Sequence, residues 1–159
     1  MKPFIPIIIF LFALPAAAQI SLSEGPAVNG IRLGASYKAV VAKFGKPLRE
    51  KTNGVDECIG DRTRKVEYPG LSFDMAESDG MFTVYGFEVT STKYDVSGVR
   101  VGTPTTAVQK RFGNVRRTVE KEKYGPRWFY DMTEKNPGGT NFYFRNGKVF
   151  SISSTYMMC

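Results

Sequence analysis

The chain has 159 residues, of which 42% are apolar and 13% aromatic, enough to build the core of one ordinary globular domain. It contains no histidine, which excludes Ser-His-Asp and Cys-His catalytic sites and metal sites built on histidine. The formal net charge of +7 favours anionic partners, but acidic and basic residues alternate, as in Glu120-Lys121-Glu122-Lys123, which is typical of a solvated surface. We therefore expect no nucleic-acid partner, no metal and no cofactor.

Residues 1–18 have the features of a secretory signal peptide. Lys2 precedes an apolar run from Phe4 to Leu14, and Ala16-Ala17-Ala18 offers a cleavage site of the A-x-A type. The run is too short to span a membrane, so we expect no stable membrane anchor in the mature chain. The sequence thus predicts export to the periplasm or secretion, with residues 19–29 as a short leader.

An eleven-residue stretch, Gly34 to Phe44, is repeated 68 residues later as Gly102 to Phe112. Both copies fit the pattern G-[IV]-R-[LV]-G, then four residues, then A-V-x-x-x-F-G. Apolar residues at helical spacing predict a short helix in each copy. Ser36 and Thr103 are the expected N-cap residues, and a glycine ends each helix.

Strand patterns follow both copies. Met81 to Ser91 is apolar on both faces, which predicts a central strand. Asn146-Gly147 predicts a two-residue hairpin turn, which would place Ile152 on one face with Tyr143 and Phe150. Glycine- and proline-containing turns separate the other expected strands.

The expected fold class is α+β. Two tandem repeats, residues 30–97 and 98–159, would each consist of a short helix or helix pair packed on a small antiparallel sheet. Together the repeats would form one compact unit.

The two cysteines, Cys58 and Cys159, are an even pair that predicts one disulfide in an oxidising compartment. Closing so long a loop would stabilise the fold by about 4–5 kcal/mol in the chain-entropy model. Two free thiols, or an intermolecular bridge through Cys159, are the alternatives.

Apolar groups on both faces of the expected strands leave aromatic side chains that the helices do not need. Tyrosine, tryptophan and arginine concentrate in protein-binding surfaces. The candidate binding face, chosen by strand alternation and with two basic residues as its rim, consists of Tyr68, Tyr85, Phe87, Trp128, Tyr130, Tyr143, Phe150, Arg145 and Lys148.

The repeated motif, the strands that follow it and the export signal together resemble the β-lactamase-inhibitory-protein-like fold. That superfamily also includes the SmpA/OmlA-type lipoprotein of the outer-membrane barrel-assembly machinery. The resemblance covers nearly all of residues 30–156 and implies a protein-binding role. The inhibitor's repeats each hold a disulfide, and the assembly subunit has one repeat and a lipidated cysteine. Because this chain lacks those features, no functional residue is carried over.

Three functions are compatible with these patterns. The first is an exported, non-catalytic protein-binding or inhibitory module whose partner is another envelope or extracellular protein. The second is an envelope structural or assembly factor that engages a partner's strand at an uncovered sheet edge. The third is an enzyme without histidine that uses a carboxylate pair, either Asp74 with Glu88 or Asp56 with Asp61.

Overall fold

The computed structural model describes residues 25–113, 117–119, 126–132 and 138–156. The predicted signal peptide, most of the leader and Cys159 lie outside the described residues, so the predicted Cys58–Cys159 disulfide stays a prediction. In chain order the elements are β1 (Ala27–Val28), β2 (Ile31–Arg32), α1 (Tyr37–Phe44), β3 (Arg49–Val55), β4 (Arg62–Tyr68), β5 (Leu71–Ser78), β6 (Met81–Val89), α2 (Thr105–Phe112), β7 (Arg117–Val119), β8 (Arg127–Asp131), β9 (Gly138–Arg145) and β10 (Lys148–Tyr156).

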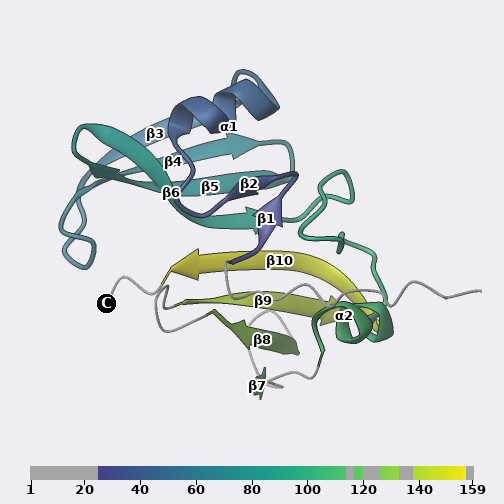
Figure 1. Cartoon of the computed structure of the whole chain (residues 1–159). Coiled ribbons are helices and arrows are strands. Elements are labelled where there is room, and N and C mark those ends of the chain that lie inside the picture. The colour runs from purple at the N-terminus through teal and green to yellow at the C-terminus, as the bar shows by residue number, and fades with distance from the viewer. Residues whose placement is uncertain (1–24, 114–116, 120–125, 133–137, 157–159) are drawn as a thin grey trace, which may run out of the picture.

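One antiparallel sheet organises the molecule. Its strand order is β3-β4-β5-β6-β10-β9-β8-β7 (Figure 1). The pairing of β6 with β10 joins the first half of the chain to the second, with Val89 opposite Ile152 and Phe87 opposite Ser154.

The predicted α+β class with two small sheets is therefore wrong. In the described part of the chain, regular structure is mostly strand, and the two helices have eight residues each. A separate sheet for each half would leave β6 and β10 as edges with unpaired backbone groups beside a buried core. Pairing the two strands with each other satisfies those groups.

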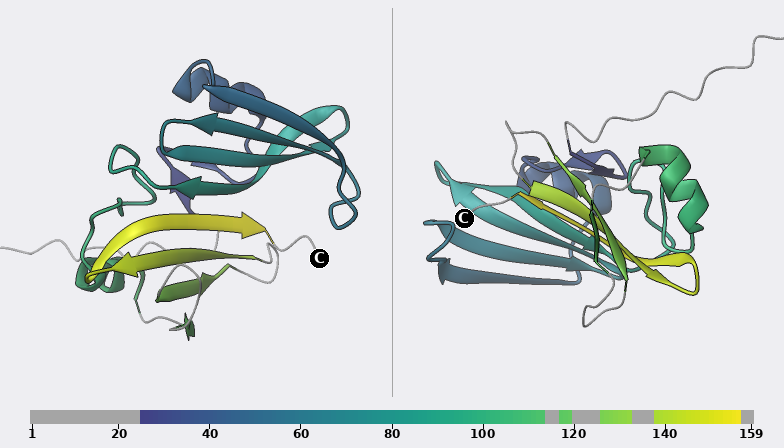
Figure 2. Two further views of the ribbon diagram at one scale, coloured as in Figure 1. Left: turned by 180° about the vertical axis from the view of Figure 1, so that it is seen from behind. Right: turned by 90° about the horizontal axis from the view of Figure 1, so that it is seen from below.

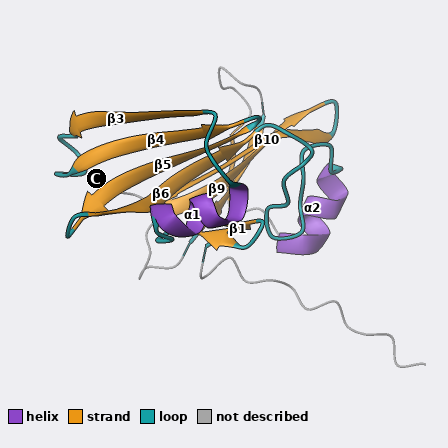
Figure 3. Cartoon of the chain, turned by 90° about the horizontal axis from the view of Figure 1, so that it is seen from above, coloured by secondary structure: helices purple, strands orange, loops and turns teal. Residues whose placement is uncertain are grey.

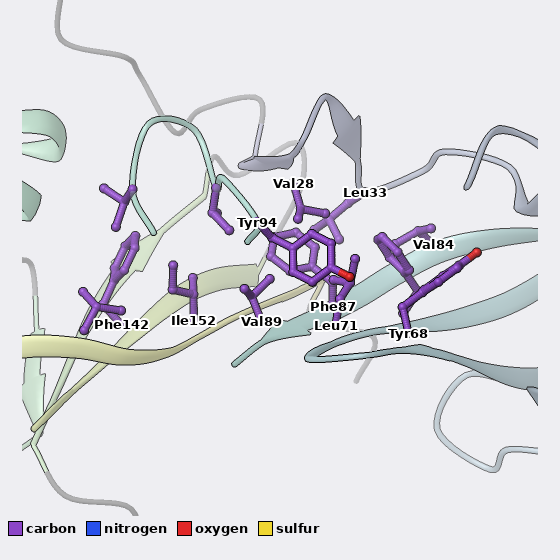
Figure 4. Close-up of a cluster of buried hydrophobic side chains, with 14 of the residues drawn as sticks. Val28, Leu33, Tyr68, Leu71, Val84, Phe87, Val89, Tyr94, Phe142 and Ile152 are labelled. Atoms are coloured by element: carbon purple, nitrogen blue, oxygen red, sulfur yellow. The ribbon is translucent and has the colours of Figure 1, made fainter. Parts of the chain in front are cut away.

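Both helices and the small β1–β2 hairpin lie on the same face of the sheet (Figures 2 and 3). Their apolar side chains form one continuous core with the strands. Val28, Val40 and Val108 are fully buried, as are Phe73 and Phe142 on the sheet. Figure 4 shows Val28, Leu33 and Tyr94 on this side of the sheet, packed over Leu71, Phe87 and Val89 of the central strands.

The repeated motif makes matching backbone contacts in its two copies. The N–H of Gly34 donates to the carbonyl of Val84 on β6 at 2.6 Å, and that of Gly102 donates to the carbonyl of Val149 on β10 at 2.7 Å. Each copy therefore fixes the start of its helix to one of the two central strands.

The two helices begin differently. Ser36 caps α1 as predicted, because its Oγ accepts from the N–H of Ala39 at 3.3 Å. The cap predicted at Thr103 is wrong. Its Oγ1 accepts from the N–H of Arg100 at 3.0 Å instead, and Pro104 occupies the cap position without a side-chain bond.

Two β-bulges change which side chains face the core. Tyr85 is the extra residue of β6 opposite Asp74 and Met75, and Phe150 is the extra residue of β10. Beyond the second bulge, Ile152 lies opposite Phe142 and is fully buried, so its predicted place beside Tyr143 and Phe150 is wrong. A bulge inserts one residue and reverses the alternation that follows it.

Candidate functional site

The sheet has a second face that points away from both helices. Side chains that alternate with the core residues lie on it, among them Lys65, Asp74, Glu88, Tyr143 and Ser151. No helix or strand among the described residues packs on this side, which we call the helix-free face (Figure 2). In a two-layer protein of this kind, such a face is available to a partner.

An aromatic patch lies on the helix-free face where β9 meets β10. The ring centres of Tyr143 and Phe150 are 6.1 Å apart, and the guanidinium carbon of Arg145 lies 4.7 Å from the centre of the Phe150 ring. Both rings are half-buried and Arg145 is exposed. We use the name aromatic patch for these three residues. The tight β9–β10 hairpin brings these residues together, and the bulge leaves Phe150 unpaired and places Ser151 opposite Tyr143.

A hollow of about 250 Å³ lies beside the aromatic patch. Its lining combines both rings with three polar side chains, those of Glu88, Ser151 and Ser153. The hydroxyl of Ser151 donates to Oε1 of Glu88 at 3.2 Å, and Ser151 itself is only 4% exposed. This bond crosses from β10 to β6 and fixes the carboxylate at the hollow.

A polar row extends from the hollow toward β8. Arg127 Nη1 donates to Oδ1 of Asn141 at 2.7 Å, and Nδ2 of Asn141 lies 3.5 Å from the hydroxyl of Ser153. Asn141 is buried, although it lies on the helix-free face. The row thus connects Arg127 on β8, through Asn141 on β9, to Ser153 on β10.

Asp74 lies on the same face, one strand away from Glu88. Burial raises the pKa of its carboxyl, and the negative charges of Glu88 and Glu67 raise it further, while Lys65 opposite lowers it. The folded state therefore disfavours the ionised carboxylate relative to the unfolded chain. The free energy of unfolding should fall as the pH rises from the ordinary aspartate pKa through the raised one.

We expect Asp74→Asn to be more stable than the wild type at neutral pH and equal to it at a pH below the ordinary aspartate pKa, where both states are protonated. Denaturant unfolding at several pH values measures the difference. Asp131→Asn is the matched control, because Asp131 is exposed on β8, and it should leave the profile unchanged. A stability loss in Asp74→Asn at neutral pH would show that the attraction of Lys65 outweighs burial.

Three of the residues predicted for the binding face lie in the core instead. Tyr68, Phe87 and Tyr130 are 7%, 2% and 4% exposed, on the helix side of the sheet. The two tyrosine hydroxyls hold the helix ends, since that of Tyr68 donates to the carbonyl of Gly45 at 3.1 Å and that of Tyr130 to the carbonyl of Gly113 at 3.3 Å. A buried tyrosine needs a partner for its hydroxyl, and the last helical turns supply one.

The remaining predicted residues divide between the two faces. Trp128 is half-buried on the helix side, with its ring 4.6 Å from that of Phe144. Tyr85 lies on the helix-free face near Asp74, where burial and the charge of Asp74 raise its pKa. Lys148 is exposed at the end of the β9–β10 hairpin, opposite Arg145. Of the predicted set, the structure thus brings Tyr143, Phe150 and Arg145 together.

Neither the hollow beside the aromatic patch nor a second hollow at the end of α1 contains both members of a predicted carboxylate pair. Glu88 lines the hollow, whereas Asp74 does not. Asp56 holds its own loop, because its Oδ1 accepts from the N–H groups of Cys58 and Ile59 at 3.0 and 3.1 Å. In the described residues, no group of three potential metal-binding side chains comes together.

Ser151 and Ser153 contribute to the hollow and were not among the predicted residues, whereas Glu88 was predicted only as the partner of Asp74 in a carboxylate pair. Alternation along β10 could have placed the two serines on one face, opposite Ile152. Their neighbours on that face depend on the bulge at Phe150, which has no marker in the sequence.

No protein-family model and no curated protein sequence matches the chain. Its fold is similar to an extracellular protein containing a SCP domain from Bacillus anthracis str. Ames, with a TM-score of 0.51 and 14% identity over 96% of this chain and 51% of that one. A cysteine-rich secretory protein from Staphylococcus aureus subsp. aureus Mu50 has a TM-score of 0.45 and 14% identity over 77% of this chain and 44% of that one. A DUF4309 family protein from Bacillus subtilis subsp. subtilis str. 168 has a TM-score of 0.45 and 16% identity over 77% of this chain and 79% of that one.

At this level of identity, the likeness to the Bacillus anthracis protein concerns the fold alone. The chain spans about half the length of the first two of these proteins. None of the three is a β-lactamase-inhibitory protein, and that resemblance stays a prediction. Within the described residues, we find no helix with the length and apolar character needed to cross a membrane.

Proposed function

We propose that this protein is an exported, non-catalytic module that binds another envelope or extracellular protein through the helix-free face. The observation that carries the proposal is the aromatic patch beside the hollow, where two half-buried rings and an arginine lie together on a sheet face that neither described helix covers. Tyrosine and arginine are enriched among the residues that dominate protein–protein affinity.

The geometry of the patch supports binding at its centre and specificity at its margin. Tyr143 and Phe150 offer rigid apolar area at a low cost in side-chain entropy. The arginine stacked on Phe150 and the carboxylate held by Ser151 supply charges of opposite sign on either side. Such a pattern favours a partner segment with one apolar anchor flanked by complementary charges.

The export part of the proposal rests on the predicted signal peptide. The extracellular description of the Bacillus anthracis protein is compatible with it.

The test is affinity capture from an envelope extract with the mature protein, followed by mass spectrometry and a binding titration of the captured partner. Tyr143→Ala/Phe150→Ala should weaken binding by at least about tenfold, because each side chain is placed as an anchor. The matched control is Val55→Ser/Met81→Ser, which removes two apolar side chains that are 67% and 61% exposed outside the patch. It should bind like the wild type.

Circular dichroism and thermal unfolding are used to check that both variants are folded. Equal loss of binding in the two variants, or unchanged binding in the patch variant, would contradict the proposed face.

The assembly-factor alternative depends on an uncovered strand edge, and β3 is the candidate. All seven of its residues are exposed, and β4 is its only partner among the described strands. Arg49, Glu50 and Lys51 place charges on this edge, and the register shifts after Thr52. Charges and irregular pairing are the usual protection of an edge against added strands. The edge therefore supports this alternative less than the patch supports protein binding.

A further inference from the structure

A second hollow, a groove of about 520 Å³, lies on the helix side of the molecule at the end of α1. It runs between that helix end, the segment that follows it, the β4–β5 turn and the loop containing Lys93. It shares no lining residue with the hollow on the helix-free face. A site there would act independently of the aromatic patch.

The apolar lining of the groove is accessible. Leu48 is 72% exposed, Pro69 is exposed, and Phe44 and Pro47 are half-buried. The ring of Phe44 is fixed from behind, since its centre lies 5.5 Å from that of Tyr68 and 5.9 Å from that of Tyr94. The groove thus has a rigid aromatic floor with an aliphatic rim. Its volume falls in the range of small-molecule sites.

Three lysines surround this floor. Lys43, Lys46 and Lys93 are exposed, and none of them forms an ion pair with a described residue. The groove's lining includes no aspartate or glutamate. Positive charges around a concave, low-dielectric surface raise the local concentration of anions.

The other polar side chains of the groove form hydrogen bonds within the protein. The hydroxyl of Tyr68 donates to the carbonyl of Gly45, and that of Tyr94 donates to the carbonyl of Pro69 at 3.2 Å. Burial raises the pKa of Tyr68 to about 12 and also raises the pKa of Tyr94, so both hydroxyls stay protonated at neutral pH. Asn29 accepts from the N–H of Asp95 through Oδ1, which leaves its amide N–H₂ group as a donor.

From this lining we infer that the groove binds a small organic anion with an aromatic body. The ring of the ligand would lie against Phe44 and Leu48, and its carboxylate would accept from the lysine ammonium groups. Apolar contact and charge complementarity then act on opposite ends of one molecule. A neutral molecule of the same shape would gain only the apolar contact.

An NMR titration tests the inference. The ¹⁵N-labelled mature protein is titrated with 2-naphthylacetate, and the changes in amide chemical shift are measured. Saturable shifts should centre on Phe44, Leu48 and Lys93. The neutral probe 2-(2-naphthyl)ethanol should bind at least about tenfold more weakly, because it lacks the charge-assisted bonds.

Two sets of variants locate the charge. Lys43→Ser/Lys46→Ser/Lys93→Ser should weaken naphthylacetate binding by about tenfold. The matched control, Lys38→Ser/Lys51→Ser/Lys110→Ser, removes the same charge from exposed positions outside the groove and should bind like the wild type. Leu48→Glu should also abolish binding without affecting the fold, since Leu48 is largely exposed.

The inference is overturned if the alcohol binds as tightly as the acid, or if the control triple variant loses as much affinity as the groove variant. It is also overturned if millimolar naphthylacetate gives no saturable shift at the groove.

Discussion

Replacing Phe142 with alanine is expected to lower the free energy of unfolding by about 3–5 kcal/mol, a loss typical of a large aromatic removed from a core. Phe142 is fully buried in the middle of the second half of the sheet. Its ring centre lies 5.2 Å from that of Phe112 on α2 and 5.7 Å from that of Tyr130 on β8, and Ile152 is its partner on β10. Alanine would leave a cavity that touches a helix and three strands, so none of them can close it alone.

Phe150→Ala is the matched control for this prediction. It removes the same side chain from the opposite face of the neighbouring strand, where the ring is half-buried against Tyr143 and Arg145. We expect a loss of about 1 kcal/mol or less, in the range of substitutions outside the core. Urea unfolding of both variants measures the difference. Similar losses in the two would contradict the placement of Phe142 in the core and Phe150 on the helix-free face.

The local parts of the fold could be predicted from the sequence because their causes are local. A hydroxyl at Ser36, a glycine after each helix and the Asn146-Gly147 turn act within a few residues, and the structure has all three as expected. Thr103 shows the limit of such a pattern. Its hydroxyl has a competing N–H at Arg100, and the sequence does not rank the two partners.

The sheet could not be predicted because its decisive contacts are distant in the sequence. The pairing of Val89 with Ile152 joins the two halves, and no spacing or turn residue marks it. No residue pattern marks the bulges at Tyr85 and Phe150 either. Each bulge reverses the alternation of side chains along its strand, and the prediction of which side chains share a sheet face depended on that alternation.

The same limit explains the mixed outcome for the candidate site. Tyr68 and Tyr130 looked like binding residues because tyrosine is common at interfaces, but each hydroxyl is used by a helix end that only the fold brings close. Tyr143, Arg145 and Phe150 belong to one hairpin, so local geometry brings them together. The sequence therefore predicts proximity best for residues that belong to the same hairpin.

Gly70→Ala is expected to lower the free energy of unfolding by about 2–4 kcal/mol, from backbone strain and a steric clash together. Gly70 ends the turn between β4 and β5 at φ +73°, where alanine is disfavoured. An added Cβ would overlap the Cβ of Ser91 and lie 3.2 Å from its backbone N. The N–H of Thr90 donates to the carbonyl of Gly70 at 2.9 Å, which prevents the neighbouring segment from moving away.

Gly80→Ala separates the two causes of that loss. Gly80 ends the turn between β5 and β6 at φ +75°, almost the same conformation, but an added Cβ there meets no atom within 4 Å. Its expected cost is the backbone strain alone, about 1 kcal/mol. The difference between the two variants in urea unfolding therefore measures how tightly the residue 90–91 segment packs on the β4–β5 turn. If the variants lose equal stability, that segment yields to the added methyl group, and the packing of the β4–β5 turn is looser than the contacts of Gly70 indicate.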